Sequence, residues 1–196
     1  MPDLSILSAP RRSLPLHRTT TTEWEEQMNS AELLTDGFGR VSQNVHRTLD
    51  GLAPEALTAR LDPAANSIAW LVWHLTRNQD DHLADAFGGE QLWTSQGWAD
   101  RFALPFDVSA TGYGQSSDEV AAVRSSAELL LGYLDAVTAQ SLSYLKSVTD
   151  DDLDRIVDTN WDPPVTLGVR LISVLSDGLQ HAGQAAFTRG IIARLG

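Results

Sequence analysis

Apolar residues recur at every third or fourth position in four long stretches of this sequence. In the first stretch, residues 30–52, they are Leu34, Phe38, Val41, Val45, Leu49 and Leu52. The other stretches are residues 67–87, 117–145 and 167–194. This spacing puts the apolar side chains on one stripe of an α-helix, whereas a half-buried strand would alternate apolar and polar residues. The pattern therefore predicts four long amphipathic helices.

Residues that start and stop helices stand at the ends of these stretches. Asn29 and Glu32 predict a capping box before the first helix. Gly88 follows the second stretch and is expected to end that helix. Ser117 and Thr166 are suitable N-caps for the third and fourth helices. We expect the third helix to bend near residues 125–126, where two serines follow each other.

Four such helices predict an all-α four-helix bundle. Residues 90–116 form a long aromatic-rich crossover loop between the second and third helices, and a connection of this length is expected to act as a lid or as the wall of a pocket. Residues 1–28 contain prolines and no periodic pattern, which predicts a flexible N-terminal tail. Residues 29–196 are then one domain.

Composition excludes several classes of function. The 196 residues include no cysteine, so the chain has no thiol nucleophile, thiolate ligand or disulfide of its own. Its 14 basic and 26 acidic residues give a net charge of −12, which argues against nucleic-acid binding. No apolar run approaches the ~20 residues that span a bilayer. We therefore expect a cytoplasmic protein that acts on a small-molecule substrate.

Three residues are candidate metal ligands. Asp177 and His181 are four residues apart, so they lie one turn apart on one face of the fourth helix. His74 is a polar residue in an apolar part of the second helix. Two imidazoles and one carboxylate suit zinc, and also nickel or iron. The alternative to a metal site is that His74 is a hydrogen-bonded core histidine and that the four-residue spacing of Asp177 and His181 arose by chance.

Two segments carry a resemblance to a known family. Residues 67–75 and 177–184 resemble the two signature helices of the DinB/YfiT-like superfamily of four-helix-bundle metalloproteins. Residues 97–114 are similar to its actinobacterial, mycothiol-dependent maleylpyruvate isomerase-like branch. The resemblance covers residues 29–194. It implies that His74, Asp177 and His181 hold the metal, with Asp177 at a position that is often histidine in the family.

The resemblance also implies an activity. A divalent metal, most simply zinc, would activate an external low-molecular-weight thiol such as mycothiol for attack on a small electrophile, in a transferase or isomerase reaction. Such a route needs no protein cysteine. The alternatives are a non-catalytic bundle that binds metal or dimerises, related to stress, and a metal-dependent hydrolase. Family members often pair through helix faces, so a homodimer is expected.

Further residues could assist at such a site. Asn78 and Asp81 could orient ligands or move a proton, and Arg189 could bind a carboxylate of the thiol or substrate. Each also has an ordinary interpretation as a solvated helix residue. Four tryptophans, in contrast, could form an apolar wall or simply fill the core. These are Trp70, Trp73, Trp93 and Trp98.

Overall fold

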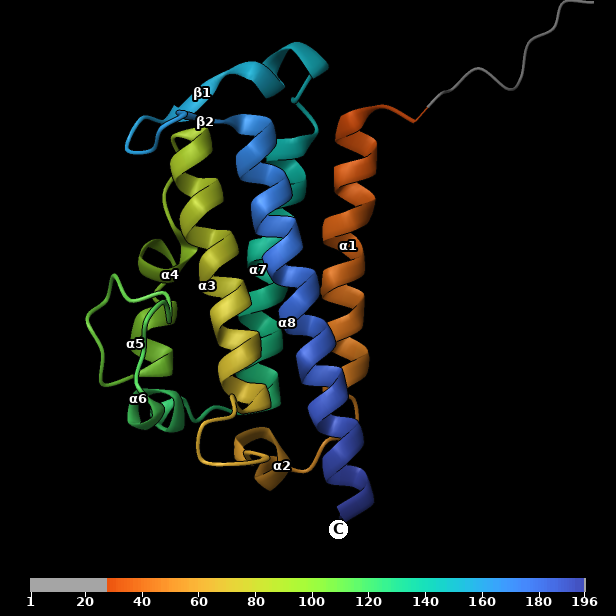
Figure 1. Ribbon diagram of the computed structural model, residues 1–196, viewed down its shortest axis with the longest axis vertical. Helices are drawn as coiled ribbons and strands as arrows, with labels where there is room; N and C mark the ends of the chain where they lie inside the picture. The colour runs from red at the N-terminus through yellow and green to blue at the C-terminus, as the bar shows by residue number, and fades with distance from the viewer. Residues whose placement is uncertain (1–27, 196) are drawn as a thin grey trace, which may run out of the picture.

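The chain folds as a ring of four long helices. The computed structural model describes residues 28–195, so the tail expected for residues 1–28 lies outside the described residues apart from Met28. The long helices are α1 (Ser30–Leu49), α3 (Ile68–Phe87), α7 (Ala127–Leu145) and α8 (Leu167–Leu195). Helices α7 and α8 each pack against both α1 and α3 (Figure 1). This arrangement confirms the predicted all-α four-helix bundle.

The direction of the helices explains the long crossover. Helices α3 and α7 run the same way along the bundle (Figure 1), so the chain must return over the full length of α3 before α7 begins. A helix of 20 residues is about 30 Å long. The crossover, residues 88–126, covers this distance along α3 and contains three short helices: α4 (Leu92–Ser95), α5 (Trp98–Phe102) and α6 (Ser117–Ala122).

Helix boundaries agree with the caps expected for α1 and α3, whereas α6 is capped by Ser116 and not by the expected Ser117. Asn29 and Glu32 form the capping box of α1, and Gly88 ends α3 with a left-handed φ of 65°. The expected third helix is divided, because residues 123–126 are not helical and separate α6 from α7. The physical reason is a second cap: the Ser126 hydroxyl accepts from the amide of Leu129 at 3.1 Å and starts a new helix.

Small elements close the ends of the bundle. One end carries α2 (Pro54–Thr58) between α1 and α3. The other carries the 3-10 helix η1 (Asp150–Asp154) and a short antiparallel pair of strands, β1 (Ile156–Asp158) and β2 (Val165–Thr166), which the sequence patterns did not predict. Arg170 of α8 donates to Asp158 at 2.7 Å and so fastens this hairpin to the bundle.

Helix α3 is buried on almost every side, because the crossover covers the face that the other long helices leave open. Its buried residues therefore include charged ones, and Arg77 and Asp80 are 0% and 1% exposed. The Asp80 carboxylate accepts from the amides of Leu92 and Trp93, at 2.9 and 2.8 Å, and so holds the first turn of α4 against α3.

The same carboxylate also connects α3 to α7. Tyr133 of α7 donates its hydroxyl to Asp80 at 2.7 Å, and Arg77 lies 3.8 Å from the same Asp80 oxygen. Burial raises the pKa of Tyr133 well above its ordinary value, so the phenol keeps its proton and remains a donor. One buried carboxylate thus joins α3, α4 and α7.

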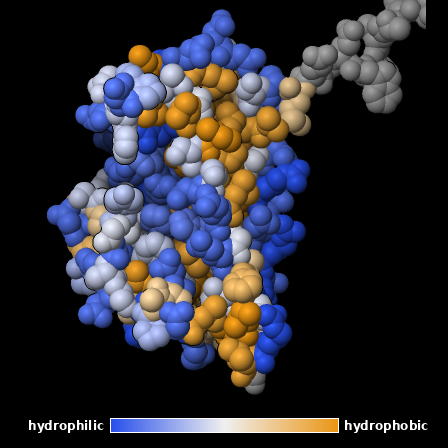
Figure 2. Space-filling view, in the orientation of Figure 1, coloured by the Kyte–Doolittle hydropathy of each residue, from blue (hydrophilic) through white to orange (hydrophobic). Residues whose placement is uncertain are grey.

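The surface has two distinct regions. Hydrophobic residues form a band over α8, whereas the area over the crossover is mostly hydrophilic (Figure 2). The exposed apolar side chains of α8 include Val169, Ile172, Leu179 and Phe187. The homodimer expected from the sequence has a candidate contact face here and stays a prediction. Within residues 28–195, every helix is too short or too polar to cross a membrane.

We predict that Asp80→Ala lowers the free energy of unfolding by about 3–5 kcal/mol, because Arg77 would remain buried without an opposite charge. Urea unfolding followed by circular dichroism measures the loss. Asp85→Ala is the matched control, since Asp85 is an exposed carboxylate on the same helix and its removal should change stability by no more than about 0.5 kcal/mol. Equal effects of the two substitutions would contradict the role assigned to Asp80.

Candidate metal centre

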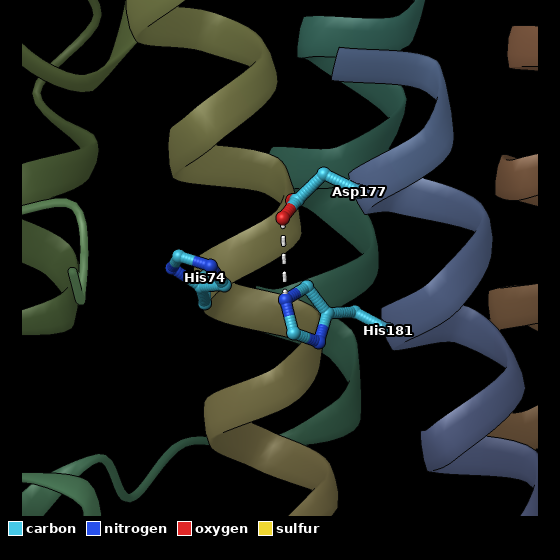
Figure 3. Close-up of side chains that lie close together, drawn as sticks. All are labelled: His74, Asp177 and His181. Atoms are coloured by element: carbon cyan, nitrogen blue, oxygen red, sulfur yellow. Dashed lines mark ion pairs between the residues drawn. The ribbon is translucent and has the colours of Figure 1, made fainter. Parts of the chain in front are cut away.

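The three candidate ligands converge at the contact between α3 and α8. His74 comes from α3, and Asp177 and His181 come from successive turns of α8 (Figure 3). Nε2 of His181 lies 3.3 Å from Oδ1 of Asp177, and one ligand atom from each of the three residues lies within 4.8 Å of the others. The rings of His74 and His181 meet edge to face with their centroids 4.8 Å apart. The cluster could hold a metal ion.

In both histidines of the cluster, Nδ1 is hydrogen-bonded to a residue outside the cluster, so Nε2 is the candidate ligand atom. Nδ1 of His74 lies 2.6 Å from the carbonyl oxygen of Thr111 and donates to it. Nδ1 of His181 lies 2.9 Å from the side-chain oxygen of Gln184 and donates to it. Both rings therefore direct Nε2 toward Asp177 and the shared space between them. Partners of this kind fix the tautomer and orientation of metal-binding histidines.

The carboxylate is positioned in the same manner. Oδ2 of Asp177 accepts from the amide of Asn78 on α3 at 2.8 Å, so Oδ1 is the oxygen turned toward the histidines. The exposed fractions of the Asp177 and His181 side chains are 30% and 17%, while His74 is buried. The site thus has a closed side at α3 and an open side at α8. A ligand from solvent can approach from the open side.

The donor types, and the spacing of one pair of them, fit a divalent ion. In a tetrahedral zinc site with bonds of ~2.0–2.1 Å, neighbouring ligand atoms are about 3.3 Å apart. The ligand atoms of His181 and Asp177 have this spacing, and all three ligand atoms lie within 4.8 Å of one another. Two nitrogens and one oxygen are also the ligand type of catalytic zinc sites, which keep a fourth position for water or substrate. The residues present therefore fit zinc, with one position open.

Trp70 of α3 and two residues of the crossover, Gln115 and Gly112, hold the His74 ring in place. The Trp70 indole is stacked on the imidazole with ring centroids 4.7 Å apart and nearly parallel planes. Its Nε1 donates to Gln115 of the crossover at 2.7 Å. Gly112 packs against this pair with a φ of +101°, and a Cβ on it would lie 2.7 Å from Nδ1 of His74. Only glycine fits at this contact without displacing the imidazole.

The pKa values of the three candidate ligands are shifted in different directions from their ordinary values. Burial lowers the pKa of His74, so its ring is neutral at ordinary pH. Burial also acts to lower the pKa of His181, but hydrogen bonds to Asp177 and Gln184 outweigh it and raise that pKa above 6.5. For Asp177, burial acts to raise the pKa, and hydrogen bonds from His181 and Asn78 outweigh it and lower it. Without a metal, His181 and Asp177 therefore behave as an ion pair.

Of the three residues that the sequence suggested as helpers at the site, only Asn78 contacts a candidate metal ligand. Asn78 reaches the site through its bond to Asp177. Asp81 accepts from Gln91 of the crossover at 2.8 Å and lies beside His82. Arg189 donates to the carbonyl oxygens of two residues at the end of α1, Arg47 and Asp50. Its guanidinium therefore satisfies the open carbonyl end of α1.

Two contributors to the site escaped the sequence patterns. Gln184 lies three residues after His181, and this i,i+3 spacing could have suggested a contact on the helix surface. The Thr111 carbonyl has no sequence signal at all, because any residue at that position would supply the same oxygen. Its contribution depends only on the path of the crossover.

The fold and site define a class: helical bundles with a cluster of two histidines and one carboxylate that could hold a metal. The family model of the DinB superfamily matches residues 38–185. The chain therefore belongs to the DinB superfamily. A crystal structure of a conserved protein from Enterococcus faecalis is similar, with 32% identity and a TM-score of 0.77 over 83% of this chain and 96% of that one. No curated protein matches this chain.

We predict that Gly112→Ala weakens zinc binding by about 10–100-fold, because the new Cβ would push Thr111 and His74 apart. Competition with a chromophoric zinc chelator measures the affinity. Gly114→Ala is the control: Gly114 has a comparable φ of +72°, but its Cβ would meet open space. Zinc affinities that fall equally in both variants would show that backbone strain, and not the contact with His74, is responsible.

Zinc affinity should fall as the pH is lowered. Because zinc binds only the unprotonated imidazole, the raised pKa of His181 makes this residue the first to compete with the metal, while His74 remains neutral. Below the pKa of His181 the affinity should decrease by about tenfold per pH unit. Chelator competition from about pH 8 to about pH 6 measures this slope. A constant affinity over this range would contradict it.

In the metal-free protein, the contribution of His181 to stability should show the opposite trend, whereas His74 and His82, whose pKa values burial lowers, contribute in the other direction. A histidine whose pKa is raised by folding stabilises the folded state when protonated, and this contribution is lost as the pH rises through the raised pKa. The difference in unfolding free energy between the chelator-treated protein and His181→Ala, measured by urea unfolding over the same pH range, isolates this contribution. A difference that grows as the pH rises would contradict the expected sign.

Proposed function

We propose that this chain is a metal-dependent enzyme that activates a low-molecular-weight thiol, such as mycothiol, for attack on a small electrophile. The observation that supports this proposal is the cluster of His74, Asp177 and His181, whose ligand atoms converge while their other polar atoms are already hydrogen-bonded. The absence of cysteine supports an external thiol as the source of the sulfur. The reaction is an S-transfer or an isomerisation.

A bound divalent ion with an open position lowers the pKa of a thiol that coordinates it, so the sulfur is present as thiolate at neutral pH. In this proposal the chain's own residues do the positioning. His74, Asp177 and His181 provide the ligand atoms, and Asn78 and Gln184 keep the carboxylate and the His181 ring in place. Because His74 is neutral, its Nε2 needs no deprotonation before it binds a metal.

Space for the thiol or the electrophile is available beside the site. A pocket of about 560 Å³ lies between α8 and the segment before α3. Gln184, which binds His181, lines this pocket together with Leu71, Phe187 and the amides of Asn66 and Gln180. Its volume falls within the range of ~300–1,000 Å³ that is usual for small-molecule sites. We propose that part of the substrate or thiol binds here.

Thiol consumption tests the proposal. The protein is stripped of metal, reloaded with zinc and mixed with mycothiol and a generic electrophile such as 1-chloro-2,4-dinitrobenzene. We expect turnover that needs both zinc and thiol. His181→Ala should lose at least about 100-fold in zinc affinity and lose the turnover.

His46→Ala is the matched control, since His46 is an exposed histidine on α1 that pairs with Asp135, and this variant should keep both properties. Zinc-loaded protein that consumes no thiol with several electrophiles would contradict the enzyme proposal and favour a non-catalytic metal-binding bundle. Turnover of an ester or amide without thiol would instead favour a hydrolase.

A further inference from the structure

Uncharged residues line the pocket between α8 and the segment before α3. Its polar side chains are three carboxamides and one hydroxyl, from Asn66, Gln180, Gln184 and Thr188. Leu71 and Phe187 supply an apolar part, and Phe187 is 64% exposed. Among the described residues, none of those that line the pocket is ionisable, although the chain has 14 basic and 26 acidic residues. The lining therefore restricts the class of ligand.

Two glutamines of this lining offer an acceptor and a donor one helical turn apart. Nε2 of Gln180 donates to the carbonyl and hydroxyl oxygens of Ser176, each at 3.2 Å, which leaves Oε1 of Gln180 to accept. Oε1 of Gln184 accepts from His181 at 2.9 Å, which leaves Nε2 of Gln184 to donate. Residues four apart are neighbours on a helix surface, so one ligand can meet both groups.

The chemistry of the lining favours a ligand with several hydroxyls. An anion or a cation would find no opposite charge there. A wholly apolar ligand would cover the carboxamides without replacing their hydrogen bonds to water, which costs free energy. A hydroxyl both donates and accepts, so neighbouring hydroxyls on one ring match Oε1 of Gln180 and Nε2 of Gln184. The C–H face of a saturated ring can pack against the exposed Phe187 ring.

We propose that this pocket binds a neutral polyhydroxyl ring, a sugar or a cyclitol, with its hydroxyls on Gln180 and Gln184 and its C–H face on Phe187. Gln184 also binds His181, so the ring lies beside the metal centre. The inference deepens the proposed function, because it names the chemical class of the group that occupies the pocket, and the role of that group in the reaction rests on the proposed function.

A pair of ring compounds tests the ligand class. The probes are myo-inositol, which carries a hydroxyl on every ring carbon, and cyclohexanol, which carries a single one. In the zinc-loaded protein, we expect myo-inositol to shift the side-chain amide NMR signals of Gln180 and Gln184 saturably. Its affinity should be at least about tenfold higher than that of cyclohexanol, because cyclohexanol leaves most of the polar lining without a hydrogen bond. Equal affinities, or no saturable shift, would overturn the proposal.

Two variants locate the bound ring. Gln180→Met keeps the length of the side chain but removes the acceptor, so it should weaken myo-inositol binding by about three- to tenfold. Gln43→Met is the matched control, since Gln43 is an exposed glutamine on α1 outside the pocket, and it should leave the affinity unchanged. Zinc affinity reports whether each variant is folded. Hydroxyls bound only to the zinc ion would be insensitive to Gln180→Met, and that result would overturn the proposal.

These measurements separate the ligand class from the thiol-dependent activity, because they need no turnover. Saturable binding of myo-inositol by a protein that consumes no thiol would support the polyhydroxyl ligand and contradict the enzyme proposal. Thiol consumption by a protein whose Gln180 and Gln184 signals do not respond to myo-inositol would overturn the polyhydroxyl ligand alone.

Discussion

Polar side chains buried on α3 are the constraint on which much of this structure depends. His74, Arg77 and Asp80 lie on a helix that is covered on nearly all sides, and a buried polar group without a partner costs free energy comparable to a lost hydrogen bond. Their partners are mostly backbone atoms of the crossover: the carbonyls of Thr111 and Ala110, and the amides that begin α4. The crossover therefore has one path along α3.

This constraint connects stability with the candidate metal centre. The crossover carbonyl that satisfies Nδ1 of His74 also turns Nε2 toward α8. Gly112, the next residue, allows the backbone to approach that closely. On the opposite side, Asn78 and Gln184 hold Asp177 and His181 in matching orientations. The ligand set is thus prearranged by contacts that also keep the protein folded, which is the usual design of metal sites with a fixed geometry.

Prediction from the sequence succeeded where the signal is local. The capping box of Asn29, the end of α3 at Gly88 and the helical spacing of Asp177 and His181 all follow from residues close together in the chain. The interruption of the third helix was expected at residues 125–126 only as a bend, and the complete division was missed because the apolar spacing continues across residues 123–126 and conceals the cap at Ser126. The burial of Asp80, next to the more exposed Asp81, was missed because it depends on where the crossover packs.

The sequence by itself determined the four amphipathic helices, the absence of cysteine and a pair of possible ligands on one helix face, because periodicity and composition act through neighbouring residues. Only the tertiary structure decided that His74 faces Asp177 and His181, that a crossover carbonyl sets its tautomer, and that Arg189 binds the end of α1. These outcomes depend on the parallel course of α3 and α7, which brings distant segments together through packing and buried hydrogen bonds.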